Sequence, residues 1–280
     1  MSRTLPLGIA LLAGLFAPPV RASEPWSSDA CMACHPTETR HWEGSRHASS
    51  ATNAHFVASL AEARFASWCR SCHEPGGAPV TCTSCHVDHE APADDVCAGC
   101  HELTGPPAFG PFALVGDPLQ STFTEWRDTP AARAGHSCAD CHLAGHRFRG
   151  AHDADLVREA FRVEVSAGSL VLRTTEALGH RLPTGDPFRT LEVRMCADRA
   201  CLQELSVLRM GVRHEADADG ALRVAFDNRL GPPGGSAPDR LEIPRPPGAL
   251  GWSVQLGLAD PLLELPPEER VVFLDSGGFP

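Results

Sequence analysis

The sequence predicts a two-domain protein, with an N-terminal domain of short α-helices and loops followed by an all-β, sandwich-like C-terminal domain. The length of 280 residues suits about two domains. Ten of the twelve cysteines lie before residue 142 and repeat one short motif. From about residue 155, short runs alternate apolar with polar residues, which is typical of strands. We therefore place the domain boundary between residues 154 and 155.

The first 22 residues read as a secretory signal peptide. Arg3 supplies a positive start, residues 5–16 form a short apolar run, and Val20-Arg21-Ala22 offers small residues for cleavage. This run is too short to span a membrane, and no longer apolar run follows it. We expect export to the periplasm, with no transmembrane segment after cleavage and a mature N-terminal domain over residues 23–154.

The charge balance excludes nucleic acid as a partner. The formal net charge is −11, and loss of Arg3 and Arg21 with the signal peptide makes the mature chain more acidic. Such a surface repels phosphate backbones. All 24 basic residues are arginine, and the chain contains neither lysine nor tyrosine.

The repeated motif is C-x-x-C-H, which is the attachment signature of c-type haem. The two thiols form thioethers to one porphyrin, and the histidine that follows coordinates the iron as its proximal ligand. The motif occurs five times. The predicted thioether cysteines are Cys31, Cys34, Cys69, Cys72, Cys82, Cys85, Cys97, Cys100, Cys138 and Cys141, and the proximal histidines are His35, His73, His86, His101 and His142.

Neither a zinc site nor a disulfide framework accounts for the motif as well as haem does. A zinc site would combine C-x-x-C pairs in twos to close a tetrahedron, without needing a histidine after every second cysteine. A disulfide framework would not repeat that histidine either. The sequence therefore predicts five covalently bound haem c groups.

The spacing of the motifs predicts a closely packed set of haems. Nine residue steps separate His73 from Cys82, and eleven separate His86 from Cys97. Even fully extended, such segments reach only about 30–40 Å, so no independent domain fits between the second, third and fourth motifs. We expect the haems to form much of the core of residues 23–154, a pentahaem cytochrome c domain.

The sixth coordination position of each iron is expected to hold a second histidine. Nine histidines remain outside the motifs. Of the methionines in the mature chain, Met32 lies inside a motif, and Met195 and Met210 lie in predicted strands. Bis-histidine ligation is favoured, and it implies low reduction potentials.

An internal repeat helps to choose among these histidines. In the segments that begin at Thr39 and Thr124, a tryptophan is followed three positions later by a hydroxyl residue: Trp42 by Ser45, and Trp126 by Thr129. The first copy continues to His47, where the second has an alanine.

Residues 30–155 resemble the tetrahaem electron-carrier cytochromes that serve hydroxylamine oxidoreductase, and their periplasmic relatives. The resemblance rests on the first motif with W-x-x-S-x-H-A, and on the close second and third motifs with the H-x-x-H that ends at His89. In that family the corresponding histidines are distal ligands, which implies this role for His47 and His89. His146 and His152 come next, and His41, His55 and His136 are weaker candidates. This chain departs from the family in carrying a fifth motif.

The C-terminal half, residues 155–280, reads as seven or eight short strands separated by Pro and Gly clusters, which favours a β-sandwich. Cys196 and Cys201 lie at a strand end without a following histidine. In an oxidising compartment a disulfide is the plain expectation, with free thiols as the alternative. The predicted strands cover residues 161–165, 170–172, 191–195, 205–212, 222–226, 241–243, 252–258 and 271–274.

One loop of this half stands out: Gly179-His180-Arg-Leu-Pro-Thr-Gly185-Asp. It resembles loops in β-domains fused to periplasmic multihaem cytochromes. That resemblance implies that His180 crosses the domain boundary and ligates a haem. The alternative is a turn with an ordinary histidine.

These features predict a periplasmic protein that transfers electrons between periplasmic or membrane-bound redox partners. The alternative is a multihaem oxidoreductase that acts on a small nitrogen or sulfur compound at an open haem. Pentahaem nitrite reductases use a lysine at their catalytic haem, and hydroxylamine oxidoreductase crosslinks its catalytic haem to a tyrosine. Because the chain has neither residue type, electron transfer is favoured and no catalytic residue is assigned.

Overall fold

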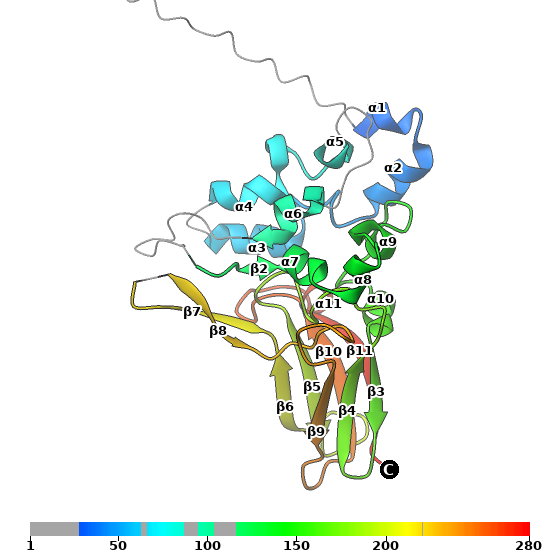
Figure 1. Cartoon of the computed structure of the whole chain (residues 1–280), viewed down its shortest axis with the longest axis vertical. Helices are drawn as coiled ribbons and strands as arrows, with labels where there is room; N and C mark the ends of the chain where they lie inside the picture. Colours follow the sequence, from blue (N-terminus) through cyan, green and yellow to red (C-terminus); the bar gives the residue numbers. More distant parts are fainter. Residues whose placement is uncertain (1–27, 63–65, 87–94, 104–115, 220) are drawn as a thin grey trace, which may run out of the picture.

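A computed structural model (Figure 1) describes residues 28–62, 66–86, 95–103, 116–219 and 221–280. The predicted signal peptide and His89 lie outside the described residues. Short helices gather in one half of the molecule and long strands in the other (Figure 1). The predicted fold class, a helical domain followed by an all-β domain, is therefore confirmed. No described helix is long and apolar enough to cross a membrane.

The helices of the first half are short, and none that is described exceeds nine residues. Hydroxyl and carboxylate side chains begin several of them: Thr129, Ser137 and Asp153 each accept a hydrogen bond from a backbone amide of the first turn. The helices are α1 Ser28–Met32, α2 Pro36–Glu43, α3 Ala54–Glu62, α4 Ala66–His73, α5 Cys82–Cys85, α6 Asp95–His101, α7 Thr122–Arg127, α8 Pro130–Arg133, α9 Cys138–His142 and α10 Ala154–Glu159, with a 3₁₀ turn η1 at Pro75–Gly77 and a two-residue pair of strands β1 Glu102–Leu103 and β2 Gln120–Ser121.

The second half packs two antiparallel sheets against one core. One sheet has the order β11-β10-β5-β6 and the other β3-β4-β9. Their inward residues meet in a single buried cluster, to which Leu172 of one sheet and Val193 and Val254 of the other belong. The strands are β3 Phe161–Val165, β4 Ser169–Thr174, β5 Thr190–Cys196, β6 Glu204–Met210, β7 Val212–Ala216, β8 Leu222–Asp227, β9 Arg240–Pro244, β10 Gly251–Gly257 and β11 Val271–Gly278, with a one-turn helix α11 at Pro267–Arg270.

The single strand expected over residues 205–212 is instead divided at Gly211. Strand β6 ends at Met210, and β7 begins at Val212 and pairs with β8 in a separate hairpin. The Gly211 amide donates to the side-chain oxygen of Asn228 (2.9 Å), and the Asn228 amide group donates to the Arg209 carbonyl oxygen (3.0 Å). The Asn228 side chain thus forms hydrogen bonds with backbone groups at and before the break. Because these groups are already bonded, the β-ladder does not continue.

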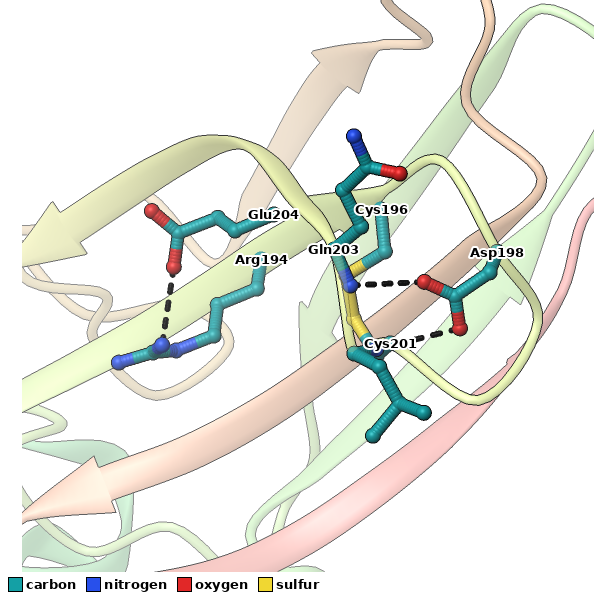
Figure 2. The surroundings of a disulfide bond; sticks show 7 residues. Arg194, Cys196, Asp198, Cys201, Gln203 and Glu204 are labelled. Atoms are coloured by element: carbon teal, nitrogen blue, oxygen red, sulfur yellow. Dashed lines mark hydrogen bonds and ion pairs between the residues drawn. A yellow bond between two sulfur atoms is a disulfide. The ribbon is translucent and has the colours of Figure 1, made fainter.

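The structure joins Cys196 and Cys201 in a disulfide, with Cα atoms 5.0 Å apart. It closes the turn between β5 and β6 (Figure 2). Asp198, inside this turn, accepts hydrogen bonds from the backbone amides of Leu202 (3.1 Å) and Gln203 (2.7 Å). These bonds hold the pKa of Asp198 below its ordinary value. The turn is thus fixed by a covalent bond and by a carboxylate.

Helix α10 ties the helical half to the sandwich. Val157 is buried in the sandwich core, and the Arg158 guanidinium donates to the carbonyl oxygen of Leu274 on strand β11 (2.6 Å). Arg149, just before this helix, pairs with Asp153 at 2.6 Å. The last helix of the first half therefore packs directly on the sheet.

Candidate functional site

Each C-x-x-C-H motif lies on a turn of helix. In the first motif the His35 amide donates to the Cys31 carbonyl oxygen (2.8 Å), and in the third the His86 amide donates to that of Cys82 (2.8 Å). The other three motifs fall within α4, α6 and α9. Residues three and four positions apart share a helix face, so both cysteines and the histidine of a motif project to one side. This is the arrangement that attachment of one porphyrin to two thiols and one imidazole requires.

None of the ten motif cysteines belongs to the disulfide of the described residues, which joins Cys196 and Cys201. Among the described residues, one group of three or more side chains has ligand atoms close enough for a shared metal ion, and it contains none of these cysteines. The thiols are therefore neither consumed in disulfides nor gathered into a described zinc site. Their chemistry fits thioether formation to haem.

Thiols from different motifs lie beside each other. Cys82 raises the pKa of Cys31 together with burial, so the first motif lies beside the third. The neighbouring thiol of Cys100 lowers the pKa of Cys72 to about 6, so the second motif lies beside the fourth.

The fourth motif also borders two others. The thiol of Cys97 acts electrostatically on that of Cys85 in the third motif. In turn His142, from the fifth motif, acts on His101. The fourth motif therefore lies next to the second, third and fifth motifs. We call the haem expected at Cys97 and Cys100 the junction haem.

Three motif histidines each face a histidine from elsewhere in the chain. The ring centres of His101 and His47 are 6.3 Å apart. Those of His86 and His146 are 6.0 Å apart. The structure thus brings together the fourth and third motifs with two of the sequence-predicted distal candidates.

The third facing pair crosses between the two halves of the protein. The rings of His142, on α9, and His180, in the loop before β5, have centres 5.9 Å apart and planes 7° apart. A bond from a metal to an imidazole nitrogen is about 2 Å long, and the ring centre lies about 1 Å further, so two imidazoles on opposite sides of one metal have centres roughly 6 Å apart. All three pairs fit this spacing.

Burial keeps one imidazole of each pair neutral. Burial, the charge of His47 and the charge of Arg189 lower the pKa of His101 to about 4. Burial and the neighbouring His142 lower the pKa of His180, and burial with His86 does the same for His146. A neutral imidazole is the form that coordinates a metal. The electrostatics of the three pairs therefore favour ligation.

Backbone carbonyl groups orient several of these rings. His142 Nδ1 donates to the Arg149 oxygen (2.7 Å), and His180 Nδ1 donates to the Arg181 oxygen (2.9 Å). His73 Nδ1, in the second motif, donates to the Ser50 oxygen (3.1 Å). A hydrogen bond at Nδ1 fixes the tautomer that leaves Nε2 available to a metal.

The loop that carries His146 has an unusual backbone. Ala144, Gly145, His146 and Phe148 all have positive φ values, of 37°, 70°, 72° and 50°. Non-glycine residues rarely adopt this left-handed region, and such strain gathers at functional sites. The Phe148 ring packs against His47, with centres 4.4 Å apart. The loop therefore positions His146, and through Phe148 it also contacts the facing pair of His47 and His101.

The internal tryptophan repeat is visible in the hydrogen bonds. The amides of Ser45 and Thr129 donate to the carbonyl oxygens of Trp42 (2.8 Å) and Trp126 (2.9 Å). Each hydroxyl then accepts from the amide three residues later, at 3.3 Å in both copies. The turn sets the direction of the chain just before His47 in the first copy.

The first and second motifs have no facing histidine among the described residues. The His73 ring instead stacks on Phe56, with centres 4.4 Å apart and planes 9° apart. His41 is hydrogen-bonded through Nδ1 to Gly145 and through Nε2 to Arg147. His136 is exposed.

His152, predicted as a distal ligand, lies in a charged cluster with His55 and Glu269. His55 Nε2 is 3.1 Å from a Glu269 oxygen. The Arg46 guanidinium contacts both Glu269 (3.1 Å) and His152 Nδ1 (2.9 Å). Arg46 already supplies a cation to this cluster. We therefore interpret the cluster as an ionic contact between α3 and α11. Sequence reasoning missed it because Glu269 lies more than 200 positions from Arg46.

A second charged network surrounds the loop of His180. Arg229, two residues after the end of β8, pairs with Glu125 of α7 and with Asp227, both at 2.8 Å. The Thr184 hydroxyl donates to Glu125 (2.9 Å). These residues line a cavity of about 320 Å³. The network fastens the histidine loop to the helical half.

Comparison with known proteins gives one informative match. No family model matches the sequence, and no curated relative does. Among solved structures, a penta-heme cytochrome c552 from Thermochromatium tepidum matches with a TM-score of 0.66 and 17% sequence identity, over 90% of this chain and 98% of that chain. The chain therefore has the fold of that structure over nearly its whole length.

Proposed function

We propose that the protein is a c-type cytochrome that binds five covalent haem groups and transfers electrons between redox partners. The observation that carries this proposal is the repeated facing of a motif histidine by a second histidine, in three separate places, at 5.9–6.3 Å between ring centres. The shared fold with a penta-heme cytochrome supports it. When bound, haem supplies one-electron redox chemistry.

The facing pairs support three ligand sets. His101 with His47, His86 with His146, and His142 with His180 would each hold one iron. For the remaining two motif histidines, His35 and His73, the sequence-predicted candidate His89 lies outside the described residues.

The neighbouring motifs support a branched path for electrons. The first motif borders the third, the third and second border the fourth, and the fourth borders the fifth. The haem on Cys97 and Cys100 would therefore receive or pass on electrons in three directions. The protein's part is to hold the groups at fixed spacing and to set their potentials through ligands, burial and charge.

The β-domain has a definite part in this proposal. It contributes His180, and it holds that loop to α7 through Arg229 and Glu125 (2.8 Å). We place the mature protein in the periplasm, with the signal peptide over residues 1–22, and with periplasmic or membrane-bound redox proteins as partners.

A second function is favoured by one observation. His73 is packed against Phe56, and no second histidine faces it among the described residues. If His89 does not ligate this iron, an open haem could react with a small nitrogen or sulfur compound. The protein would then be a multihaem oxidoreductase.

Haem content and turnover separate these functions. We expect the pyridine haemochrome assay to give five haems per chain, and small redox mediators to reduce and reoxidise all five. Addition of nitric oxide or hydroxylamine should give no catalytic turnover. Fewer than five haems would contradict the cofactor count, and stoichiometric turnover at a high-spin haem would replace the carrier function with the enzymatic one.

A further inference from the structure

Arg189 is a partly buried cation that forms no ion pair with a carboxylate of the described residues. Its Nε atom is buried and makes no hydrogen bond among the described residues. Its Nη1 donates only to a backbone oxygen, that of Thr184, at 3.0 Å. Burial lowers the pKa of Arg189. The molecule therefore keeps a charge in a costly position, where a compensating anion is expected.

The fold makes room for this guanidinium. Gly185 has a φ of +94°, and a side-chain carbon at that position would overlap the Arg189 guanidinium. The glycine belongs to the same loop that carries His180. The loop thus shapes a place for Arg189 as well as presenting a histidine.

Asp186, three positions before Arg189, forms no ion pair with it. Asp186 acts on it only through space, while an oxygen of the exposed Asp186 carboxylate accepts from the Phe188 amide (2.8 Å). The other arginines lining the same cavity differ in this respect: Arg229 and Arg181 both pair with Asp227. Within the described part of the chain, Arg189 is therefore the one of these three arginines that pairs with no carboxylate.

Arg189 lies close to the fourth motif. It lines the same cavity as Gln120, whose side-chain amide nitrogen lies 3.3 Å from His101 Nδ1. The anion that Arg189 requires should therefore belong to the site of His101.

We propose that Arg189 binds a propionate carboxylate of the haem attached at Cys97 and Cys100. This inference rests on the proposed function, because haem c is the group that supplies a propionate there. A guanidinium offers a planar fork of donors that matches a carboxylate. The buried Nε and the remaining Nη2 supply such a fork.

The contact would set the potential of the junction haem. A cation beside a haem disfavours the more positive ferric state, so it raises the reduction potential. Removal of Arg189 would leave the propionate charge uncompensated and would stabilise the ferric state. The midpoint potential of that one haem should therefore fall, while the other four stay close to their original values.

The test compares the potentials of the holoprotein variants Arg189→Gln and Arg189→Lys with those of the natural protein. Spectroelectrochemical titration should show one haem moved to a lower potential in Arg189→Gln, and a smaller shift in Arg189→Lys. Arg213→Gln removes the same charge from a side chain that is 69% exposed, and it should move no potential. A crystal structure of the holoprotein should show a propionate oxygen hydrogen-bonded to Arg189.

Three results would overturn the proposal. The first is an unchanged set of five potentials in Arg189→Gln. The second is a shift confined to the haem at Cys138 and Cys141, and the third is a holoprotein structure in which Arg189 pairs with a protein carboxylate. Haem content of the natural protein is measured first, so that a failure of the pentahaem assignment is seen separately. If Arg189→Gln does not mature, the graded shift in Arg189→Lys and the crystal structure still decide the question.

Discussion

His180 and His142 face each other across the boundary between the β-sandwich and the helical half, with ring centres 5.9 Å apart. One ring belongs to a loop before β5 and the other to the last C-x-x-C-H helix. Under the proposed function, this pairing would make the β-domain a structural component of a haem site, because one of the two ligands of that iron would come from it.

Replacement of His180 by alanine should remove the sixth ligand of one haem. We expect electron paramagnetic resonance of the ferric protein to show one new high-spin signal and one fewer low-spin haem. His214→Ala is the matched control, because His214 lies in the same half but its Nε2 is hydrogen-bonded to the Pro118 oxygen (2.8 Å). An unchanged spectrum in His180→Ala would remove His180 from the ligand set.

Gly145→Ala should disturb the loop that presents His146. At a φ of +70° an added side-chain carbon is strained, and it would also lie 3.1 Å from the His41 ring. We expect a loss of about 1–2 kcal/mol in the free energy of unfolding, together with weaker low-spin signals from the haem on His86. Gly150→Ala, which meets no atom within 4 Å, should have little effect on either measurement. Equal effects of the two variants would contradict the role of the left-handed loop.

Arg229→Gln should destabilise the contact between the helical half and the β-sandwich. The side chains of Arg229 and Glu125 are only 8% and 6% exposed, and removal of one partner leaves a buried charge without compensation. We expect denaturant unfolding to show a loss of about 3–5 kcal/mol. The exposed pair Arg213–Glu215 provides the control, and Arg213→Gln should cost less than about 1 kcal/mol. Similar losses in both variants would argue against a buried network.

Acid should also weaken the contact between the helical half and the β-sandwich. Burial raises the pKa of Asp227, but its bonds to Arg229 and the nearby Arg181 outweigh this and hold the pKa below its ordinary value. A carboxylate with a depressed folded-state pKa contributes stability above its unfolded pKa of about 4, and that stability is lost as the pH falls through the folded value. Unfolding measured from pH 7 to pH 2 should show this loss below about pH 4, and it should be smaller in Asp227→Asn.

The disulfide should stabilise the sandwich without affecting the haems. Cys196 and Cys201 close a loop of five residue steps, for which chain entropy gives about 2 kcal/mol. The double variant Cys196→Ser/Cys201→Ser should lose about this amount in chemical unfolding and keep all five haems. Loss of a haem would indicate that these thiols take part in attachment.

The sequence was sufficient for features that depend on short spacings. Alternation along Leu191–Met195 predicted β5, and the five closely spaced C-x-x-C-H motifs predicted an N-terminal domain of short helices and loops. The sequence did not predict which residues far apart in the chain contact each other. Nothing local links His47 to His101 or Arg46 to Glu269, since packing of the whole chain decides which side chains meet. The break at Gly211 was missed because it depends on the distant Asn228.

The central claim is that three motif histidines share an iron with His47, His146 and His180, and the axial ligands of the ferric holoprotein test it most directly. Near-infrared magnetic circular dichroism distinguishes bis-histidine haems from other ligand sets and can be calibrated against the haem content. The structure predicts at least three bis-histidine haems in the natural protein, and one fewer in each of His47→Ala, His146→Ala and His180→Ala. Fewer than three in the natural protein, or variants that retain the full number, would contradict the account.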